Sequence, residues 1–411
     1  MIWPLYYAGM YFMNLGIRIS SLWNPKAAKW ISGRKDWREN IKVLTEKQAT
    51  RIWFHVSSLG EFEQARPVME ELKRGNPGLE IILTFFSPSG YEIRKNYAQA
   101  KVFYLPADLP VNAQYWISII KPDLAVFVKY DLWPGFLQAL IQHKLPFILI
   151  SAHFRPGSLS SWSIPPTSFL LKKANAIFLQ NEQWVVKLKE KGFYNIRIAG
   201  DTRIDRTLML VHESVHQLPK EIKALAPFDL IAGSTWREDE DLLIPAIEKL
   251  NLKVILAPHD ISEPNINRLL KQINVPALRF SQWKEKNQDF QMLIIDNIGM
   301  LAYLYSLGKI AFIGGGFGKG IHNILEPAAH HVPIVFGPKY NAFPEAVSMI
   351  RSGAAISIRD PSELERAIQL FSGKNGQSAG ERAYTFLENN KGATQIITSY
   401  IRESIPFGFK S

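Results

Sequence analysis

Residues 309–336 read KIAFIGGGFGKGIHNILEPAAHHVPIVF. An apolar run ends at Ile313, a glycine-rich loop follows, a helix-like segment starts at Asn323, and a second apolar run covers 333–336. This order predicts a βαβ unit whose glycines let the backbone approach a ligand. The helix start offers unpaired N–H groups to an anion, and Glu326 is placed to accept hydrogen bonds from hydroxyls. The stretch therefore predicts a site for a phosphorylated, hydroxyl-rich ligand.

The loop fits neither of two standard phosphate-binding motifs. A dinucleotide fingerprint that starts at Gly314 needs a glycine where the chain has Lys319. A P-loop needs four residues between its glycines and a Ser or Thr after its lysine, but three residues separate Gly314 from Gly318, and Gly320 follows Lys319. For the loop taken alone, an ordinary strand–helix turn is an equal alternative.

Similar apolar runs recur along the chain and alternate with helix-like segments. They are short, rich in β-branched residues and nearly continuous in apolar character, which is typical of parallel strands buried on both faces. The expected strands are Ile52–Val56, Ile81–Phe85, Val102–Tyr104, Leu124–Val128, Phe147–Ser151, Ala176–Leu179, Leu230–Ala232, Lys253–Ala257, Leu293–Asp296, Ile310–Ile313 and Ile334–Phe336. The alternation predicts an α/β protein of two Rossmann-like, doubly wound domains facing a central cleft.

The length and composition agree with two domains. The 411 residues are enough for two full cores. A polar stretch with Pro219 and Pro227 separates the halves. We therefore expect a first domain over 31–207, a linker over 208–228 and a second domain over 229–411 that includes the C-terminal helices. The chain has no cysteine, which excludes disulfides, thiolate metal sites and cysteine catalysis.

The N-terminal segment indicates an anionic partner. Residues 1–17 carry no charged side chain, while the whole chain has a formal net charge of +11 with an excess of cations before residue 52. An apolar, aromatic stretch followed by cations is typical of a segment that binds an anionic membrane surface. We expect residues 1–22 to associate with a membrane, either as a short anchor or in the interface. The alternative is a helix packed on the protein itself. No nucleic-acid motif accompanies the charge, and we expect no nucleic-acid partner.

Polar residues follow several expected strands at their carboxyl ends, where ligands bind in such folds. In the first half, Glu61 is placed either to act as a general base or simply to favour a helix start. Lys129 and Asp131 share one side of an extended turn. Arg203 is placed to contact an anionic group, although a lone arginine is more often a surface charge.

The second half offers a matching set of strand ends. The Ser-Thr pair at 234–235 precedes an acidic helix start and resembles a cap that also contacts phosphate, with a plain cap as an equal alternative. Pro258 and His259 follow another strand. Backbone groups at 297–300 are placed to hold a base or ribose.

One literal metal motif is present. Residues 212–216 read HESVH, which fits the zinc-protease pattern H-E-x-x-H. Pro219 follows almost at once, and no third ligand stands nearby. We therefore expect no metal, and no cofactor is expected.

As a set, four motifs resemble the 3-deoxy-D-manno-octulosonic acid (Kdo) transferases of Gram-negative bacteria. They occur in the family's order: Ser58–Glu61, Asp131–Pro134, Ala232–Thr235, and His322–Ala329 continuing to Phe336–Pro338. The resemblance covers nearly the whole chain from about Ile31. It implies a GT-B glycosyltransferase that is inverting and metal-independent, with CMP-Kdo as donor and a tetraacyl lipid A precursor bearing two phosphates as acceptor. It also implies work at the cytoplasmic face of the inner membrane.

The resemblance assigns roles to individual residues. Glu61 matches the catalytic base, and Arg203 matches a basic position that stabilises the transition state. Lys129 stands where the family has an acidic residue, and we expect it to stabilise the departing anion or the Kdo carboxylate. The expected CMP contacts are Pro258, His259, Ile298, Gly299, Met300, Asn323, Ile324, Leu325 and Glu326. The expected phosphate contacts are Gly233, Ser234, Thr235 and Lys319.

The chain departs from the family's pattern at one expected donor contact, and alternative functions remain open. The family's Pro-Arg-His reads Pro258-His259-Asp260 here, so we expect Lys319 or Lys339 to replace the lost arginine. The alternatives are another GT-B transferase that uses a UDP-sugar, or a catalytically inactive membrane-bound binding protein. Glu61 in its Ser-Leu-Gly-Glu context favours Kdo transfer. The motifs leave open the number of Kdo residues added, the acyl pattern of the acceptor and the oligomeric state.

Overall fold

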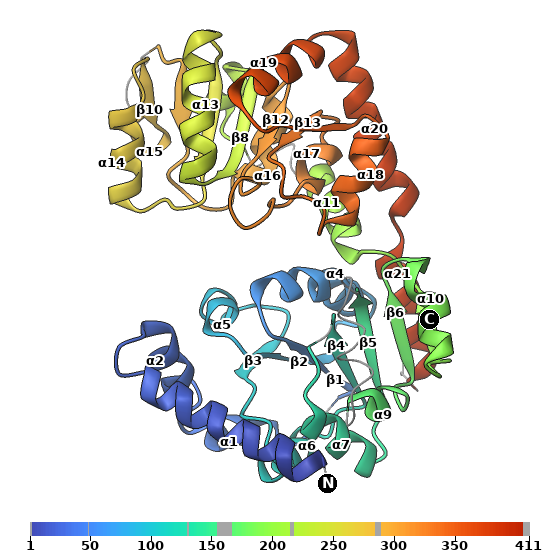
Figure 1. Ribbon diagram of the computed structural model, residues 1–411. Helices are drawn as coiled ribbons and strands as arrows, with labels where there is room; N and C mark the ends of the chain where they lie inside the picture. The colour runs from blue at the N-terminus through green and yellow to red at the C-terminus, as the bar shows by residue number, and fades with distance from the viewer. Residues whose placement is uncertain are drawn as a thin grey trace. The chain divides into compact units, whose positions relative to one another are not determined.

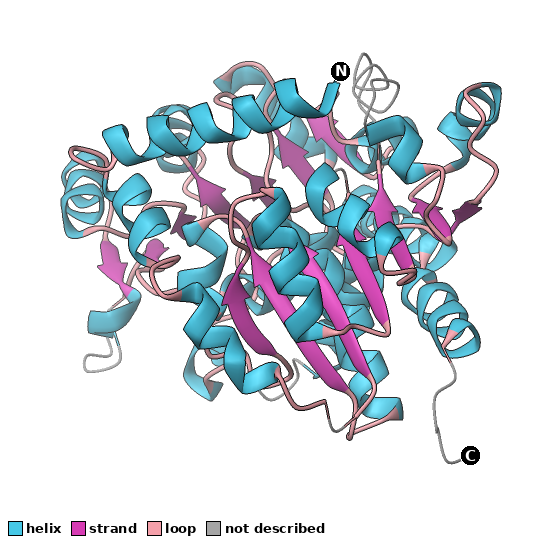
Figure 2. Ribbon diagram, turned by 90° about the horizontal axis from the view of Figure 1, so that it is seen from below, coloured by secondary structure: helices cyan, strands magenta, loops and turns pink. Residues whose placement is uncertain are grey.

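The computed structural model describes residues 2–47, 49–129, 131–153, 167–213, 218–283 and 289–405. Its contacts divide the chain into two compact units. The first unit is Met1–Asp205 with Lys391–Ser411, and the second is Arg206–Asn390. Each unit holds one seven-stranded sheet in which all recorded strand pairs are parallel. Figures 1 and 2 show the strands of each sheet running alongside one another with helices packed along them.

The sheet of the first unit has the order β3-β2-β1-β4-β5-β6-β7. Its strands are β1 (Arg51–Val56), β2 (Glu80–Phe85), β3 (Lys101–Tyr104), β4 (Leu124–Val128), β5 (Phe147–Ala152), β6 (Ala176–Leu179) and β7 (Ile196–Ile198). Its helices are α1 (Ile2–Ser20), α2 (Pro25–Ser32), α3 (Trp37–Asn40), α4 (Leu59–Gly75), α5 (Pro88–Arg94), α6 (Pro110–Ile120), α7 (Pro134–Gln142), α9 (Thr167–Leu171), α10 (Val185–Glu190) and α21 (Ala393–Ser404), with short 3₁₀ turns at Ile41–Leu44 and Glu182–Trp184.

Both faces of this sheet are buried. Every residue of β1 and β4 is buried, as expected for a central strand between two helical layers. On one face, Trp53 and Phe127 pack with α6, α7 and α9. On the other face, Phe54 and Val126 pack with α4 and α21. The first unit is therefore doubly wound, as predicted.

The C-terminal helix belongs to the first unit. Ile397 and Ile401 of α21 are fully buried in the core that α4 and β1 share. The Asp205 carboxylate accepts hydrogen bonds from the backbone N–H groups of Gly392 and Thr394, both at 2.6 Å, and so fixes the start of α21. The prediction that the second domain runs to residue 411 is corrected, because the chain returns to the first unit after Asn390.

The sheet of the second unit has the order β10-β11-β9-β8-β12-β13-β14. Its strands are β8 (Leu230–Thr235), β9 (Val254–Pro258), β10 (Ala277–Arg279), β11 (Met292–Ile294), β12 (Ala311–Ile313), β13 (Ile334–Phe336) and β14 (Ala355–Ser357). Its helices are α12 (Lys220–Ala224), α13 (Arg237–Lys249), α14 (Glu263–Gln272), α15 (Phe280–Trp283), α16 (Leu301–Leu304), α17 (Leu325–Ala329), α18 (Pro344–Arg351), α19 (Pro361–Leu370) and α20 (Lys374–Asn390), with a 3₁₀ turn at Tyr305–Leu307. Leucine and isoleucine side chains of α13, α14 and α19 pack on β8 and β9.

Three strands were not predicted from the sequence, namely β7, β10 and β14. Each has three residues, and each forms an edge of its sheet. Edge strands have a neighbour on one side only, so they need no continuous apolar run. In β7, Ile196–Ile198 has a central Arg197, and two of its three residues are exposed.

The expected linker contains helical structure. α11 (Thr202–Glu213) starts in the first unit and continues into the second, and α12 follows it. The literal H-E-x-x-H motif ends at His216 and lies largely outside the described residues. Among the residues that the structure describes, no group of three or more His, Cys, Asp or Glu side chains is placed to hold a metal ion.

The N-terminal segment folds as a helix that is anchored to the first unit. α1 lies beside α6 and α7 (Figure 1), and Trp3 packs against the core that they share. Tyr6 Oη donates a 2.6 Å hydrogen bond to Asp108, and Tyr7 Oη donates one of 3.1 Å to Gln138. In the described part of the chain, no helix combines the length and the apolar character needed to cross a membrane.

Candidate functional site

Glu61 lies at the first turn of α4, directly beyond the carboxyl end of β1. Its Oε2 atom accepts hydrogen bonds from the backbone N–H of Ser58, at 2.7 Å, and from the Ser58 hydroxyl. This is the N3 position of a capping box, so the carboxylate supports the helix start. The side chain is only partly buried, and every hydrogen bond recorded for it uses Oε2. Capping and proton transfer are therefore compatible roles for Glu61.

Arg203 pairs with Asp201 at the same edge of the sheet, and the charge of Lys129 also acts on this carboxylate. Arg203 donates from Nε, at 2.9 Å, and from Nη2, at 2.5 Å, to Asp201 Oδ2. Burial raises the pKa of Asp201, but the charge and hydrogen bonds of Arg203, with the charge of Lys129, outweigh it and hold the pKa below its usual value. Arg203 is thus part of an ion pair rather than a lone surface charge, and the group of three carries a net positive charge.

Non-glycine residues with left-handed backbones mark the carboxyl ends of three strands. Lys129 follows β4 with φ of 60°, Ser151 lies near the end of β5 with φ of 54°, and Ser234 lies near the end of β8 with φ of 54°. Such conformations are costly for residues other than glycine and occur often at functional sites. Sequence alone gives no signal of this strain.

Gln64 was not anticipated and lies one turn after Glu61 on α4. It is 1% exposed, and neither of its amide side-chain atoms has a hydrogen-bond partner among the described residues. Its backbone carbonyl accepts a 2.7 Å hydrogen bond from the Thr202 hydroxyl, which lies 3.4 Å from the Ser151 hydroxyl. Buried amides without partners are rare, so Gln64 is an unusual buried polar side chain near Glu61.

Asp131 faces a histidine that sequence reasoning also missed. His55 Nε2 lies 3.0 Å from Asp131 Oδ2 and accepts a 2.9 Å hydrogen bond from Trp133 Nε1. His55 Nδ1 lies 2.9 Å from the Thr84 hydroxyl. The Asp-Leu-Trp motif thus folds over the end of β1, and its spacing places a carboxylate and an indole on one imidazole.

In the second unit, the glycine loop packs closely on the protein's own backbone. A Cβ atom on Gly314 would lie 2.2 Å from Ser234 O, and one on Gly316 would lie 2.6 Å from Gly337 N. Both distances are too short for any side chain. These glycines are therefore required where the ends of β8, β12 and β13 meet.

The amides of the loop are largely used within the chain. Gly315 N donates to Asp239 at 2.8 Å, while Gly318 N and Gly320 N both donate to Gly315 O at 3.0 Å. His322 N donates to Gly314 O at 3.1 Å. These four N–H groups are not open to an anion, so the interpretation of the loop as an anion cradle is revised.

The helix after the loop begins at Leu325 rather than at Asn323. Asn323 Oδ1 accepts from Leu325 N at 3.1 Å, and Asn323 Nδ2 donates to Glu326 Oε1 at 2.9 Å. Ile324 and Leu325 are 1% exposed and belong to the core. Asn323 and Glu326 are thus the polar side chains that this segment presents.

The expected phosphate contacts differ in accessibility. Gly233 is buried, and a Cβ there would meet Tyr305 Oη at 2.0 Å. The Thr235 hydroxyl is buried and donates to Glu240 at 3.0 Å. Lys319 is exposed. The residue that precedes α13 is Trp236, and its backbone N–H donates to Asp239 at 2.8 Å. The helix cap that was expected at 234–235 therefore lies one residue later.

Three flat side chains form a stack, and they come from the segments that follow β8, β9 and β12. The ring centroids of Trp236 and His259 lie 4.4 Å apart, and those of His259 and His322 lie 4.7 Å apart. Trp236 Nε1 donates a 2.9 Å hydrogen bond to His322 Nε2. Burial, and then the nearby His259, lowers the pKa of His322 to about 4. His322 is therefore a neutral hydrogen-bond acceptor near neutral pH.

The remaining expected donor contacts lie at neighbouring strand ends. Pro258 ends β9 and is buried, and His259 follows it. Ile298 is 88% exposed, and Met300 is partly buried. Gly299 has φ of 103° and open space where a Cβ atom would lie. Lys339 donates from Nζ to Gly318 O at 2.7 Å and so braces the glycine loop.

The titration of His322 gives a first prediction. Because its pKa is lower in the folded protein than the usual 6.5, the unfolded chain binds the proton more readily. The stability that neutral His322 contributes is present above pH 6.5 and is lost as the pH falls toward 4. In NMR titrations, the His322 ring should stay neutral at pH 5.5, and Trp236→Phe should raise its pKa because an N–H donor to the neutral ring is removed. An unperturbed pKa in the wild type would contradict the partial burial of His322 in this stack.

Solved structures show the fold. UDP-GlcNAc 2-epimerase from Neisseria meningitidis is similar with a TM-score of 0.59 and 15% identity, covering 86% of this chain and 99% of that chain. MurG from Acinetobacter baumannii is similar with a TM-score of 0.55 and 13% identity, covering 86% and 99%. At these identities the likeness shows the fold alone. The predicted α/β architecture of GT-B type is confirmed, while the cleft expected between the domains stays a prediction.

Sequence comparisons show which proteins the chain resembles. The model of a family described as 3-deoxy-D-manno-octulosonic-acid transferase (kdotransferase) matches residues 35–206. The 3-deoxy-D-manno-octulosonic acid transferase of Haemophilus influenzae is 27% identical over 377 residues, covering 85% of this chain and 86% of the relative. That of Aquifex aeolicus is 29% identical over 327 residues, covering 76% and 83%. The predicted resemblance to the Kdo transferases is confirmed, and the similarity to these named transferases over most of the chain supports a glycosyltransferase that acts in lipopolysaccharide synthesis.

Proposed function

We propose that this protein transfers Kdo from CMP-Kdo to a hydroxyl of the tetraacyl lipid A precursor, with inversion at the transferred carbon and with Glu61 as general base. The observation that carries the proposal is the position of Glu61. Its carboxylate lies at the carboxyl end of β1 in a chain related to Kdo transferases, within the family-matched residues 35–206. The first unit would hold the acceptor, and the second would hold the donor.

The proposed reaction is a single displacement. Glu61 takes the proton of the acceptor hydroxyl, the acceptor oxygen bonds to the anomeric carbon of Kdo, and the bond from that carbon to the phosphate oxygen of CMP breaks. The electron pair leaves with CMP. One displacement with one base inverts the configuration. Lys129 and Arg203 are the cationic groups of the first unit that we assign to the Kdo carboxylate or to charge that develops in the transition state.

The donor would bind at the carboxyl edge of the second sheet. The exposed Trp236, with His259 and His322, offers flat surfaces suited to a nucleotide. Glu326 and Asn323 offer oxygens and an amide to ribose hydroxyls, and Ile298–Met300 offers exposed backbone. Ile324 and Leu325 would contribute through their backbone, and the exposed Lys319 would contribute charge to the phosphate.

The acceptor places the protein at a membrane, and we propose the cytoplasmic face of the inner membrane. Support comes from α1 and the turn after it, where Phe12, Leu22 and Trp23 are 73%, 82% and 70% exposed. Large apolar side chains on a helix followed by cations are typical of interfacial binding.

Release of CMP tests the donor. The full chain, incubated with CMP-Kdo and the tetraacyl precursor in detergent, should release CMP only when the acceptor is present. The rival that uses a UDP-sugar predicts release of UDP from UDP-GlcNAc instead. If neither nucleotide is released by folded protein, the remaining alternative is a binding protein without turnover.

A further inference from the structure

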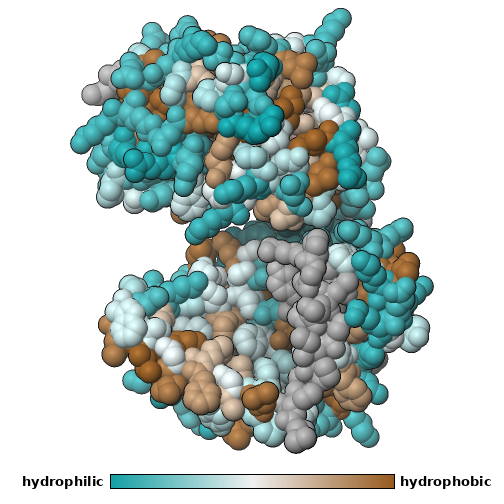
Figure 3. Space-filling view, in the orientation of Figure 1, coloured by the Kyte–Doolittle hydropathy of each residue, from teal (hydrophilic) through white to brown (hydrophobic). Residues whose placement is uncertain are grey.

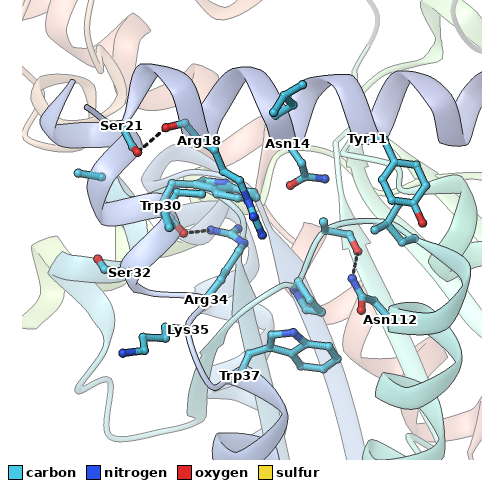
Figure 4. Close-up of a pocket in the computed structure, with 16 residues that line it drawn as sticks. Tyr11, Asn14, Arg18, Ser21, Trp30, Ser32, Arg34, Lys35, Trp37 and Asn112 are labelled. Carbon is cyan, nitrogen blue, oxygen red and sulfur yellow. Dashed lines mark hydrogen bonds between the residues drawn. The ribbon is translucent and has the colours of Figure 1, made fainter. Parts of the chain in front are cut away.

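A pocket of about 870 Å³ in the first unit lies between α1, α2 and the segment 106–112 (Figure 4). Three cations line it, Arg18, Arg34 and Lys35, and no Asp or Glu does. The rest of the wall consists of apolar and aromatic side chains with a few amides and hydroxyls. Its chemistry therefore suits an anion that carries an apolar part.

Arg34 is a buried cation without a carboxylate partner. The side chain is 9% exposed, and its guanidinium donates to the backbone carbonyls of Leu105 at 2.7 Å, Trp30 at 3.2 Å and Phe86 at 2.6 Å. Within the described ranges no carboxylate lies within 4.0 Å of it. Burial lowers its pKa to about 9. A buried charge without a counter-charge is costly, so an anion in the pocket would offset this cost.

Arg18 and Lys35 add accessible donors. Both are exposed, and neither forms an ion pair with a carboxylate in the part of the chain that the structure describes. In Figure 4, Arg18 extends from the last turn of α1 over the pocket beside Trp30. Guanidinium groups bind phosphate through paired hydrogen bonds, and a lysine adds a flexible point charge.

The walls of the pocket are held in place by the fold. Tyr6 ties α1 to Asp108, and the Asp108 carboxylate also accepts from Gly135 N, at 2.8 Å, and Phe136 N, at 2.9 Å. At the other wall, a Cβ on Gly33 would lie 2.1 Å from the Tyr104 ring, so α2 packs directly on the end of β3. The pocket is thus preformed rather than dependent on a mobile segment.

An exposed apolar face borders the pocket. Six large apolar side chains of α1 and the turn after it are at least half exposed: Leu5, Phe12, Leu15, Ile19, Leu22 and Trp23. Figure 3 shows apolar surface along this part of the first unit. The spacing of 5, 12 and 19 is seven residues, which keeps these side chains on one face of the helix. A free phosphate makes no apolar contact with such a face, whereas the acyl chains of a phosphorylated lipid can pack against it.

We propose that this pocket binds the phosphomonoester of an acylated lipid, with Arg18 and Lys35 as phosphate ligands, Arg34 as the buried counter-charge and the acyl chains along the exposed face of α1. The proposal rests on the proposed function, whose acceptor carries two phosphates. Arg34 also connects the pocket to the catalytic edge. Phe86, which accepts from Arg34, donates from its N–H to Val56 O at 3.2 Å, at the end of the strand that leads to Glu61.

Vesicle sedimentation of the full chain tests the pocket. Phosphatidylcholine vesicles would contain either phosphatidic acid, a phosphomonoester, or phosphatidylglycerol, a phosphodiester, at matched surface charge. Wild type should bind the phosphatidic acid vesicles about tenfold more tightly, because the monoester offers more charge and more acceptor oxygens to the cations. The double substitution Arg18→Ser with Lys35→Ser should abolish this preference.

The matched control is Lys26→Ser with Lys29→Ser. It removes the same two charges from exposed positions of α2 that do not line the pocket. This control should bind all charged vesicles more weakly and keep the preference. Equal loss of preference in both double variants, or no preference in the wild type, would overturn the proposal. Saturable binding of inorganic phosphate without a vesicle preference would assign the pocket to a free anion and also overturn it. CMP release is a separate readout, so failure of the pocket and failure of the transferase are distinguishable.

Discussion

Glu61→Gln is expected to lower the turnover of Kdo transfer by about 10²- to 10⁴-fold, the usual contribution of a general base. The substitution is informative because glutamine still fills the last position of a capping box and accepts from Ser58 N. Stability should therefore change by no more than about 0.5 kcal/mol. The two roles of Glu61 are separated by this one change: the cap survives, and the base is lost. Initial rates of CMP release and urea denaturation measure the two effects.

Glu63→Gln is the matched control on the same helix. Its carboxylate pairs with Arg94 at 2.9 Å and is about one-third exposed. Turnover of this variant should stay within about twofold of the wild type, since it leaves the end of β1 untouched. If Glu61→Gln retained wild-type turnover, Glu61 would be a helix cap only.

Ile397→Ala is expected to destabilise the first unit by about 2–5 kcal/mol, as for other large-to-small changes in a packed core. Ile397 is fully buried against residues of β1, β4 and α4, although it lies close to the C-terminus. Hydrogen exchange should therefore speed up in β1, β4 and β5. The strands β8, β9 and β12 should keep their protection, because α21 belongs to the other unit.

Its neighbour Ile396 supplies the control. This side chain is 46% exposed on the same helix, and Ile396→Ala should cost about 0.5 kcal/mol or less. Loss of protection in β8 and β12 on Ile397→Ala would restore the original assignment of residues 391–411 to the second unit.

The buried strands were predictable because a parallel strand between two helical layers must be apolar throughout. All five residues of β4 are buried, and Leu124–Val128 was predicted with its observed bounds. The short edge strands carry no such pattern. The destination of α21 was not predictable either, since the spacing of Ile397 and Ile401 shows that one face is buried but not which sheet covers it.

The candidate site also has a part that could be predicted from the sequence and a part that could not. Residues that follow buried strands, such as Glu61, Lys129 and His259, could be placed because parallel strands bring their carboxyl ends to one edge. The partners of these residues depend on contacts between loops. The stack on His322, the ion pair of Arg203 and the close approach of Gly314 to Ser234 each require the positions of two loops at once. The local sequence pattern does not give the position of one loop relative to another.

The mass of the acceptor lipid after the reaction shows whether the protein transfers Kdo. The full chain would be incubated with CMP-Kdo and the tetraacyl lipid A precursor, and the lipid analysed by mass spectrometry. We predict a lipid heavier by one or more Kdo residues, with one CMP released for each, and no such product from Glu61→Gln. An unchanged lipid with CMP-Kdo, together with a product that carries the sugar of a UDP-linked donor, would contradict this prediction.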